Sequence, residues 1–271
     1  MIPLGPADRA AIEAVLRTRP TDAMFPLANL RDHGMEGDHP NAIRFWGDAS
    51  PPRRAVLGLT NRGMVLPFAT EPGPAAAILR GRPIAGFAGP SGSVRPLMRA
   101  LGLDAPAGGL DADEPQFHLD LATLRVPEGP GTLVPLTLDR ARAVAWRVAY
   151  TREIDMGTGS QAEAEKDVAG WIAADSHSFL VVDGAPIAMT GFNARLPDIV
   201  QVGGVYVPPA ARRRGLGRRA VALHLAEACS QGIGQATLFA ASEAAVACYR
   251  PLGFKRIGDF ALVVRETAVM A

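Results

Sequence analysis

The sequence predicts an α/β protein of the α+β type, in which strands and helices alternate along the chain. Apolar residues recur at helical spacing over 6–18, 141–151 and 161–174, whereas short apolar runs over 43–68 and 178–207 indicate strands. Asn61-Arg-Gly63 and Asp183-Gly184 are typical of hairpin turns between such strands. With 271 residues, the chain is long enough for two domains.

In the first half, the pattern predicts helices over 6–18 and 25–30, then strands over 43–46, 54–59 and 64–68. Pro6 suits the first turn of its helix, where a backbone N–H has no partner to lose. We expect a helix over 74–79, a strand over 83–87, a helix ending near 101 and a strand over 115–124.

Two stretches rich in Gly, Pro and Asp, 104–114 and 127–132, interrupt these patterns. The second is the expected linker, so we place the domains at 1–128 and 131–271. The second half then predicts strands over 133–136, 178–182, 186–192, 199–207, 235–240 and 254–265. Its helices are expected over 141–151, 161–174, 213–231 and 242–252. The similar alternation in both halves suggests an internal duplication.

Composition excludes several classes of protein. The 28 Lys and Arg residues nearly balance the 27 Asp and Glu residues, so no excess of positive charge indicates a nucleic-acid partner. No run approaches the ~18–20 apolar residues of a membrane span, and the N-terminus lacks the apolar run of a secretion signal. Two cysteines provide no disulfide framework, and the histidines have no metal-ligand spacing. We therefore expect a soluble, cytoplasmic monomer or homodimer without a metal.

One segment is typical of an anion site. A strand that ends in Val205-Tyr-Val207 is followed by Arg212-Arg-Arg-Gly215-Leu-Gly217-Arg218, which opens a long helix. Glycines let the backbone approach a ligand, the first N–H groups of a helix favour an anion, and arginines suit phosphates. The segment has neither the Gly-Lys-Ser/Thr of a Walker loop nor a Gly-x-Gly-x-x-Gly fingerprint. The alternative is an ordinary solvated turn.

A second segment lies some thirty residues downstream. Ser242, Ala245 and Tyr249 share one face of a predicted helix, which ends near Pro251 and is followed by Gly253-Phe254. The two segments together resemble the GNAT superfamily of acyl-CoA-dependent N-acyltransferases. Its motif Arg/Gln-x-x-Gly-x-Gly/Ala is matched after a Val-x-Pro strand end, and Asn-x-x-Ala-x-x-x-Tyr-x-x-x-Gly-Phe is matched except that Ser242 replaces Asn.

The resemblance covers about residues 131–271 and implies a fold. Each half is expected to be a GNAT-like domain with a mixed, mostly antiparallel central sheet flanked by helices, the first half being a degenerate copy. In the second half, strands 199–207 and 237–240 should be parallel and splay apart, with Gly203-Gly204 marking a bulge or a close approach. Acetyl-CoA would bind in that splay as a cosubstrate.

The resemblance also implies roles for individual residues. The cofactor-binding set is Val205, Tyr206, Val207, Arg212, Arg213, Arg214, Gly215, Leu216, Gly217, Arg218, Ser242 and Ala245. The Val207 N–H would stabilise the oxyanion, and Tyr249 would protonate the departing thiolate, unless it is only a core aromatic. Ser242 is expected to cap its helix. Glu153 is the first candidate for the base, with His177 and Asp198 as alternatives.

These assignments predict an enzyme that transfers the acetyl group to a primary amine of a small molecule, an amino acid or a peptide, by direct attack in a ternary complex. A non-catalytic acyl-CoA sensor and an unrelated nucleotide binder are the alternatives. In the first half, Gly89-Pro-Ser-Gly-Ser93 lies between a strand and a helix but lacks the arginine. We expect a plain turn there, with anion binding through its amides as the alternative.

Overall fold

The computed structural model describes residues 1–105, 108–154 and 159–271, and it divides into two compact units. The first unit comprises residues 1–115 and 258–271, and the second comprises residues 116–257. The linker expected at 127–132 falls inside the second unit, where residues 124–131 contain neither helix nor strand. The boundary expected between residues 128 and 131 divides the sequence into two halves, and it stays a prediction. The two compact units are divided at other positions, after residues 115 and 257.

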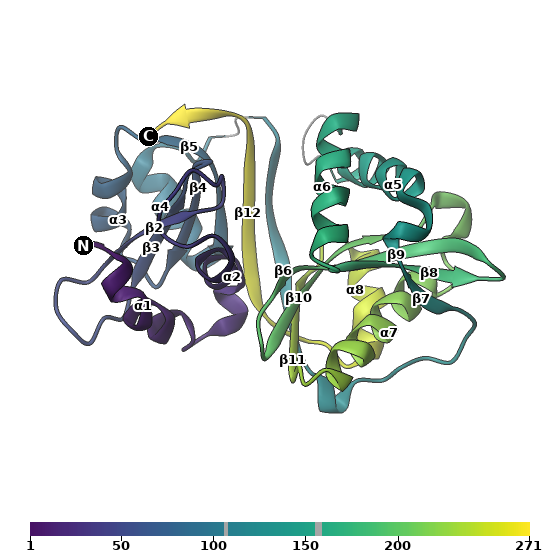
Figure 1. The fold of residues 1–271 in the computed structure, drawn as a ribbon. Helices are drawn as coiled ribbons and strands as arrows, with labels where there is room; N and C mark the ends of the chain where they lie inside the picture. Colours follow the sequence, from purple (N-terminus) through teal and green to yellow (C-terminus); the bar gives the residue numbers. More distant parts are fainter. Residues whose placement is uncertain (106–107, 155–158) are drawn as a thin grey trace. The chain divides into compact units, whose positions relative to one another are not determined.

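The first unit is built on a sheet with the order β1-β2-β3-β4-β5-β12 (Figure 1). Its strands are β1 (Ile2–Leu4), β2 (Ile43–Gly47), β3 (Val56–Thr60), β4 (Met64–Phe68), β5 (Pro83–Pro90) and the second part of β12 (Lys255–Met270). Among the described residues of this unit, β4 and β5 are the one pair in parallel. The helices are α1 (Arg9–Leu16), α2 (Met24–His33), α3 (Pro72–Leu79) and α4 (Ser91–Leu101).

The second unit repeats this arrangement with the order β7-β8-β9-β10-β11-β6. Its strands are β7 (Thr132–Pro135), β8 (His177–Val182), β9 (Ala185–Arg195), β10 (Ile199–Tyr206), β11 (Gln235–Phe239) and the end of β6 (Leu110–Asp120). Within the part of this unit that the structure describes, β10 and β11 are the one parallel pair. Its helices are α5 (Arg140–Glu153), α6 (Gln161–Ala173), α7 (Leu216–Ser230) and α8 (Glu243–Tyr249).

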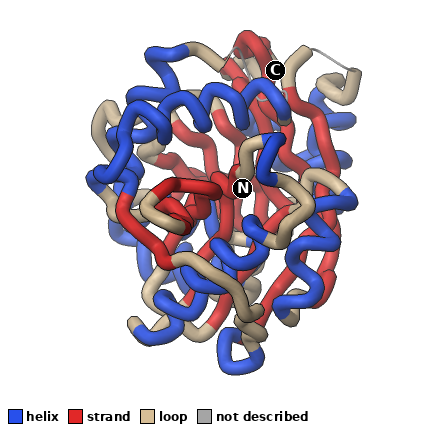
Figure 2. Tube along the Cα trace, turned by 90° about the vertical axis from the view of Figure 1, so that its right-hand side faces the viewer, coloured by secondary structure: helices blue, strands red, loops and turns tan. Residues whose placement is uncertain are grey.

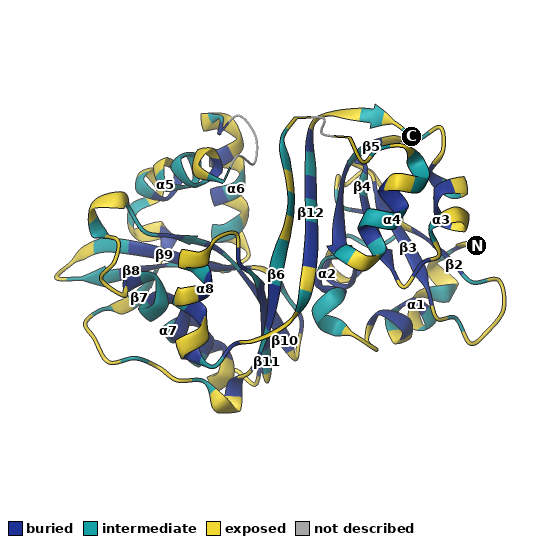
Figure 3. Ribbon diagram, turned by 180° about the vertical axis from the view of Figure 1, so that it is seen from behind, coloured by how far each residue is buried: buried dark blue, intermediate teal, exposed yellow. Residues whose placement is uncertain are grey.

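Helices cover both faces of the sheet in the second unit (Figures 1 and 2). On one face, α5 and α6 pack on a core that includes Phe179, Met189 and Tyr206. On the other face, α7 and α8 pack on Val200, Val202 and further apolar residues of β6 and β11. Alternating side chains of each strand therefore supply two different cores. Figure 3 shows that α3 and α7 are each buried on one side, toward the sheet, and exposed on the other.

The two units exchange their last strands. The strand that follows α4 is β6, whose residues 116–120 pair with β11 of the second unit. The strand that follows α8 is β12, whose later residues pair with β5 of the first unit. In both units the added strand is antiparallel and lies beside the second member of the parallel pair. The identical order of elements supports the expected duplication, and each unit completes its sheet with the other half's strand.

The predicted α+β class, with two mostly antiparallel sheets flanked by helices, is confirmed. Both hairpin turns are present, with positive φ at Asp183 and Gly184 as a type I′ turn requires. The long helix predicted over 213–231 begins only at Leu216, because Arg213 (φ 62°) and Gly215 (φ 75°) are left-handed. The short strand β1 was not predicted, and β6 begins at Leu110, inside a stretch expected to be irregular.

The strand exchange can be tested at Phe260, which lies on β12 and is 2 % exposed. Its ring packs against Phe25 of α2, with 6.0 Å between the ring centroids. We predict that Phe260→Ala destabilises the first unit by about 3–5 kcal/mol, the usual cost of emptying a buried aromatic site. Hydrogen exchange should accelerate in β5 and α2, whereas Met270→Ala, at a site 66 % exposed, should change little. Faster exchange confined to residues 116–257 would contradict the assignment.

Candidate active site

The parallel pair of the second unit separates soon after it begins. The ladder between β10 and β11 joins Ile199 to Gln235, Val200 to Ala236 and Gln201 to Thr237, and no later pair is formed. Both strands continue beyond this point, β10 to Tyr206 and β11 to Phe239. The expected splay between these strands is therefore present. The edge of β10 that faces β11 has backbone groups beyond Gln201 that are not engaged in this ladder.

A bulge in β10 accompanies the separation. The register between β9 and β10 shifts between Gln201 and Val202 and again between Gly203 and Tyr206. Gly204 has φ +63°, and a Cβ on Gly203 would lie 2.0 Å from Asn193 Nδ2. Side chains at these two positions would be strained or would clash, so the glycines permit the bulge. The expected bulge at Gly203-Gly204 is confirmed.

The loop between β10 and α7 turns sharply before the helix begins. Arg213 and Gly215 both have positive φ, and residues 212–215 are exposed. Gly215 is the N-cap of α7 and has no side chain that could cap the first turn. The first amides of α7 are thus available to an anion, and the dipole of a 15-residue helix favours negative charge there.

Gly217 allows α7 to start close to the end of β10. A Cβ at this position would lie 3.2 Å from Val207 Cγ2 and 3.8 Å from Val205 Cγ1. It would also lie 3.9 Å from Cys248 Sγ, which places α8 beside the same turn. Burial raises the pKa of the Cys248 thiol to about 11, so the thiol is protonated and unreactive at neutral pH. Three elements therefore converge on the first turn of α7.

Arg212, the first residue of the predicted motif, makes its contacts with neighbouring protein groups. Its Nε donates to the Val207 carbonyl at 2.9 Å, and its Nη2 lies 2.8 and 2.6 Å from the two carboxylate oxygens of Glu153. Its guanidinium carbon is 5.8 Å from the centre of the Tyr206 ring. The sequence-based candidate for the base and the cofactor motif are thus brought together, by an ion pair that spacing along the chain did not indicate.

The Tyr206 side chain joins this cluster: the sequence placed Tyr206 in the cofactor-binding set but did not predict its contact with Arg212. Burial raises the pKa of the Tyr206 phenol, the Glu153 charge raises it further and Arg212 lowers it. Alternation along β10 was the available signal, because it places Tyr206 on the face opposite Val205 and Val207. Tyr206 lies in the core under α5 and α6, whereas Val205 packs against the core under α7 and α8.

The second motif forms the short helix α8. Ser242 is its N-cap, and the Ser242 hydroxyl accepts from Ala245 N at 3.2 Å, as the sequence predicted. Tyr249, at the end of the helix, is 8 % exposed and packs edge-on to Phe254 with ring centroids 6.1 Å apart. Its neighbour in sequence, Cys248, is the residue that approaches Gly217. The Tyr249 ring thus packs in the core, one residue along the chain from the side chain that approaches Gly217.

The other two candidates for the base lie elsewhere. Asp198 precedes β10, so the eight residues of that strand separate it from Val207 by roughly 25 Å. His177 is buried under α6, where it stacks on Trp171 at 3.9 Å and Nδ1 lies 2.9 Å from Ser176 Oγ. Burial lowers the pKa of His177 well below its usual range. Its ring occupies the space that a Cβ on Gly204 would fill.

The described start of the corresponding helix in the first unit does not favour an anion. Its helix between the parallel strands is α3, which begins Glu71-Pro72-Gly73-Pro74 with Glu71 as N-cap. Two prolines remove N–H donors from the first turn, and the Glu71 carboxylate repels an anion. The loop Gly89-Pro-Ser-Gly-Ser93 is not the counterpart, because it joins β5 to α4 and so matches the turn between β11 and α8.

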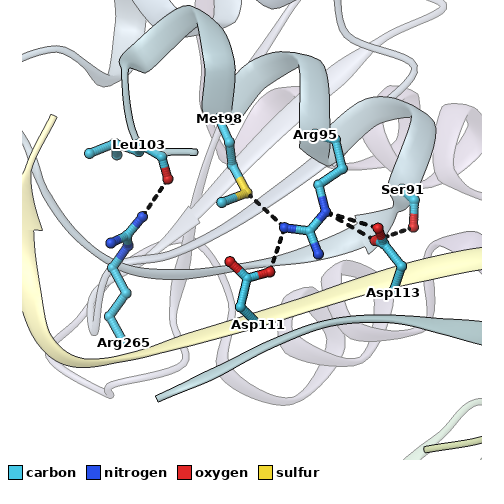
Figure 4. Close-up of polar contacts among 7 residues, drawn as sticks. All are labelled: Ser91, Arg95, Met98, Leu103, Asp111, Asp113 and Arg265. Carbon is cyan, nitrogen blue, oxygen red and sulfur yellow. Dashed lines mark hydrogen bonds and ion pairs between the residues drawn. The ribbon is translucent and has the colours of Figure 1, made fainter. Parts of the chain in front are cut away.

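At that turn of the first unit, a carboxylate of the chain accepts hydrogen bonds from two side chains of the turn and of α4. Asp113 accepts from Ser91 Oγ at 2.7 Å and from Arg95 Nε at 3.1 Å (Figure 4). Arg95 also pairs with Asp111. The Ser91 hydroxyl and the Arg95 guanidinium are therefore engaged within the unit.

Two features are absent from the described residues. They contain no group of three or more His, Cys, Asp and Glu side chains that could hold a metal ion. None of their helices combines the length and the hydropathy needed to cross a membrane.

Comparison with protein families identifies the second unit. Residues 144–254 match the model of the acetyltransferase (GNAT) family, and this segment is a GNAT acetyltransferase domain. The match spans α5 to the turn after α8, which includes both motifs and the separating strands. Members of the family use acetyl-CoA as a cosubstrate. No curated protein matches the sequence.

Solved structures extend the likeness in fold to nearly the whole chain. A Drosophila protein has a TM-score of 0.67 at 14 % identity, with 98 % of each chain covered. A GCN5-related N-acetyltransferase-like protein from Streptococcus suis has 0.56 at 13 %, covering 96 % of this chain and 100 % of the other. A tandem GNAT protein from the clavulanic acid biosynthesis pathway has 0.53 at 15 %, covering 97 % and 96 %. At these identities the likeness concerns the fold.

His224, on α7, connects acidity with the stability of the second unit. It is 6 % exposed, stacks on Phe192 at 3.9 Å, and burial lowers its pKa from 6.5 to about 4. The His224 imidazole therefore binds a proton below about pH 6.5 in the unfolded chain, but only below about pH 4 in the folded chain. Stability present above pH 6.5 is lost as the pH falls through this window, by about 3 kcal/mol in total.

We predict that His224→Leu reduces this acid-dependent loss of stability, whatever it does at neutral pH. The slope of unfolding free energy between pH 6.5 and 4.5 is the measurement, taken from urea unfolding. His39→Leu, at an exposed site, should keep the wild-type slope. An unchanged slope in His224→Leu would mean that His224 does not contribute to it.

Proposed function

We propose that the second unit transfers the acetyl group of acetyl-CoA to a primary amine of a small molecule, an amino acid or a peptide. One observation carries the proposal: an uncapped helix N-terminus, preceded by three exposed arginines, lies at the end of a strand that has left its parallel partner. An anionic head group fits the helix end, and an extended chain fits the open strand edge.

Acetyl-CoA has both of these chemical parts. Its pyrophosphate would be held by backbone N–H groups from Arg213 to Arg218, with Arg213 and Arg214 adding charge. Its pantetheine arm would pair with the backbone of Val205 and Val207 along the edge of β10. Ser242 and Ala245 stay predicted contacts of this arm, although the Ser242 oxygen already caps α8. When bound, the cosubstrate supplies an acyl group activated as a thioester.

The transfer follows from a direct attack. The acceptor nitrogen forms a bond to the acyl carbon as the bond from that carbon to sulfur breaks. The Val207 N–H is proposed to stabilise the negative charge that develops on the carbonyl oxygen. The acceptor ammonium loses one proton beforehand to a base or to water, and Tyr249 is proposed to give its phenol proton to the departing thiolate. The nitrogen loses its second proton as the amide forms, and this proton restores the Tyr249 phenol. Glu153 is the sequence-based candidate for that base.

Two observations favour a second function, a non-catalytic acyl-CoA sensor. Ser242 stands where the family motif has Asn, and it caps α8. Glu153 is engaged by Arg212. Such a protein would bind acetyl-CoA without releasing its thiol, so titration followed by a thiol-release assay over a panel of amines separates the two functions.

We predict a single acetyl-CoA site per chain, with micromolar affinity in isothermal titration. Gly217→Val should abolish binding, because its side chain would press on Val207 at the first turn of α7. Gly73→Val is the matched control: it changes the second residue of α3 in the first unit, where a Cβ meets open space. Two sites per chain, or loss of binding in the control only, would contradict this assignment. If the wild-type protein does not bind acetyl-CoA, the proposed function is wrong.

We predict that Tyr249→Phe lowers turnover by about 10²-fold or more, the usual contribution of a positioned acid. Acetyl-CoA affinity should stay within about twofold, because phenylalanine keeps the edge-on contact with Phe254. Steady-state rates and titration of the same preparation measure the two quantities. Full activity in Tyr249→Phe would assign Tyr249 to packing alone.

A further inference from the structure

Glu153 occupies a junction between two parts of the second unit. It is the last residue of α5, while Arg212 begins the loop that leads to α7. The two Glu153 oxygens lie 2.8 and 2.6 Å from Arg212 Nη2. This ion pair connects positions 59 residues apart and ties the end of α5 to the candidate cofactor loop.

Arg212 carries this connection to the end of β10. Its Nε donates to the Val207 carbonyl at 2.9 Å, so one planar guanidinium holds the Glu153 carboxylate and the Val207 backbone together. The ring of Tyr206 lies against the same guanidinium. A residue whose N–H must point at a developing charge needs a fixed backbone, and Arg212 fixes it from the carbonyl side.

The same contacts oppose a role for Glu153 as the base. Both of its oxygens already accept from Arg212 Nη2, so the ion pair holds the carboxylate toward the cofactor loop. A general base must lie within hydrogen-bond reach of the proton that it removes. We propose that Glu153 is a positioning residue, which acts through Arg212 on Val207 and the loop 212–217, and that the acceptor proton leaves by another route.

The proposal rests on the acetyl transfer proposed above, and the exposure of the pair makes it testable. The Glu153 and Arg212 side chains are 40 % and 42 % exposed. Exposed ion pairs contribute little to folding, so their loss should leave the unit folded. The variants Glu153→Gln, Arg212→Gln and the double variant remove the charge pair from either side or from both. Asp167→Asn is the control, because it breaks the ion pair of α5 with Arg147 and leaves the loop untouched.

A positioning role predicts a distinct kinetic pattern. Glu153→Gln should raise the KM for acetyl-CoA by up to about fivefold, the scale of an exposed pair, while kcat stays within about threefold. The acid limb of the rate against pH should not move. In the Arg212→Gln background the same substitution should have no further effect, because its target is gone. Asp167→Asn should match the wild type.

A base role predicts the opposite pattern and would overturn the proposal. Glu153→Gln would then lower kcat by about 10²-fold or more in both backgrounds and would remove the acid limb. Hydrogen exchange in the protein without substrates gives an independent readout. Glu153→Gln and Arg212→Gln should each speed exchange of the amides of 213–218, and unchanged exchange would also overturn the proposal. If no variant, nor the wild type, transfers acetyl, the proposed function fails while this exchange test still decides the role of Glu153.

Discussion

The candidate site depends on a parallel ladder that stops after three residue pairs. Beyond Gln201 and Thr237 the two strands continue without pairing, and this separation leaves a strand edge inside the unit. Sheets normally keep such edges paired, since buried backbone groups are costly to leave without partners. The bulge at Gly203-Gly204 bends β10 where the ladder ends. A ligand with an extended amide-bearing arm is the natural partner for an edge of this kind.

The first unit shows which local features turn this frame into a site. It has the same order of strands and the same helix between its parallel pair, yet α3 begins with Pro72 and Pro74 under a Glu71 N-cap. The second unit has Gly215 and Gly217 at the corresponding start of α7. The fold is therefore common to both halves, and a few residues at one helix end decide whether an anion is attracted or repelled.

The sequence was sufficient for most of the elements and for the frame of the site. Motifs such as Arg212 to Gly217 act through local backbone geometry, which neighbours in the chain determine, so their helix, loop and strand were predictable. The exchange of β6 and β12 was not predictable. Both strands alternate between apolar and polar residues, and this pattern does not say which of the two sheets a strand joins. The pairing of Glu153 with Arg212 was equally hidden, since it depends on how α5 packs across β10.

A neutral ring supports the bulge. A Cβ on Gly204 would lie 2.4 Å from His177 Nε2, and one on Gly191 would lie 2.0 Å from His177 Cδ2, so the imidazole fills the room that these glycines leave. Because burial lowers the pKa of His177 well below its usual range, the ring carries no charge at neutral pH. A charged ring would have to be desolvated against the backbone of β10. The strand that bears Val205 and leads to Val207 is thus shaped by two glycines, which lack side chains, and by an uncharged histidine ring.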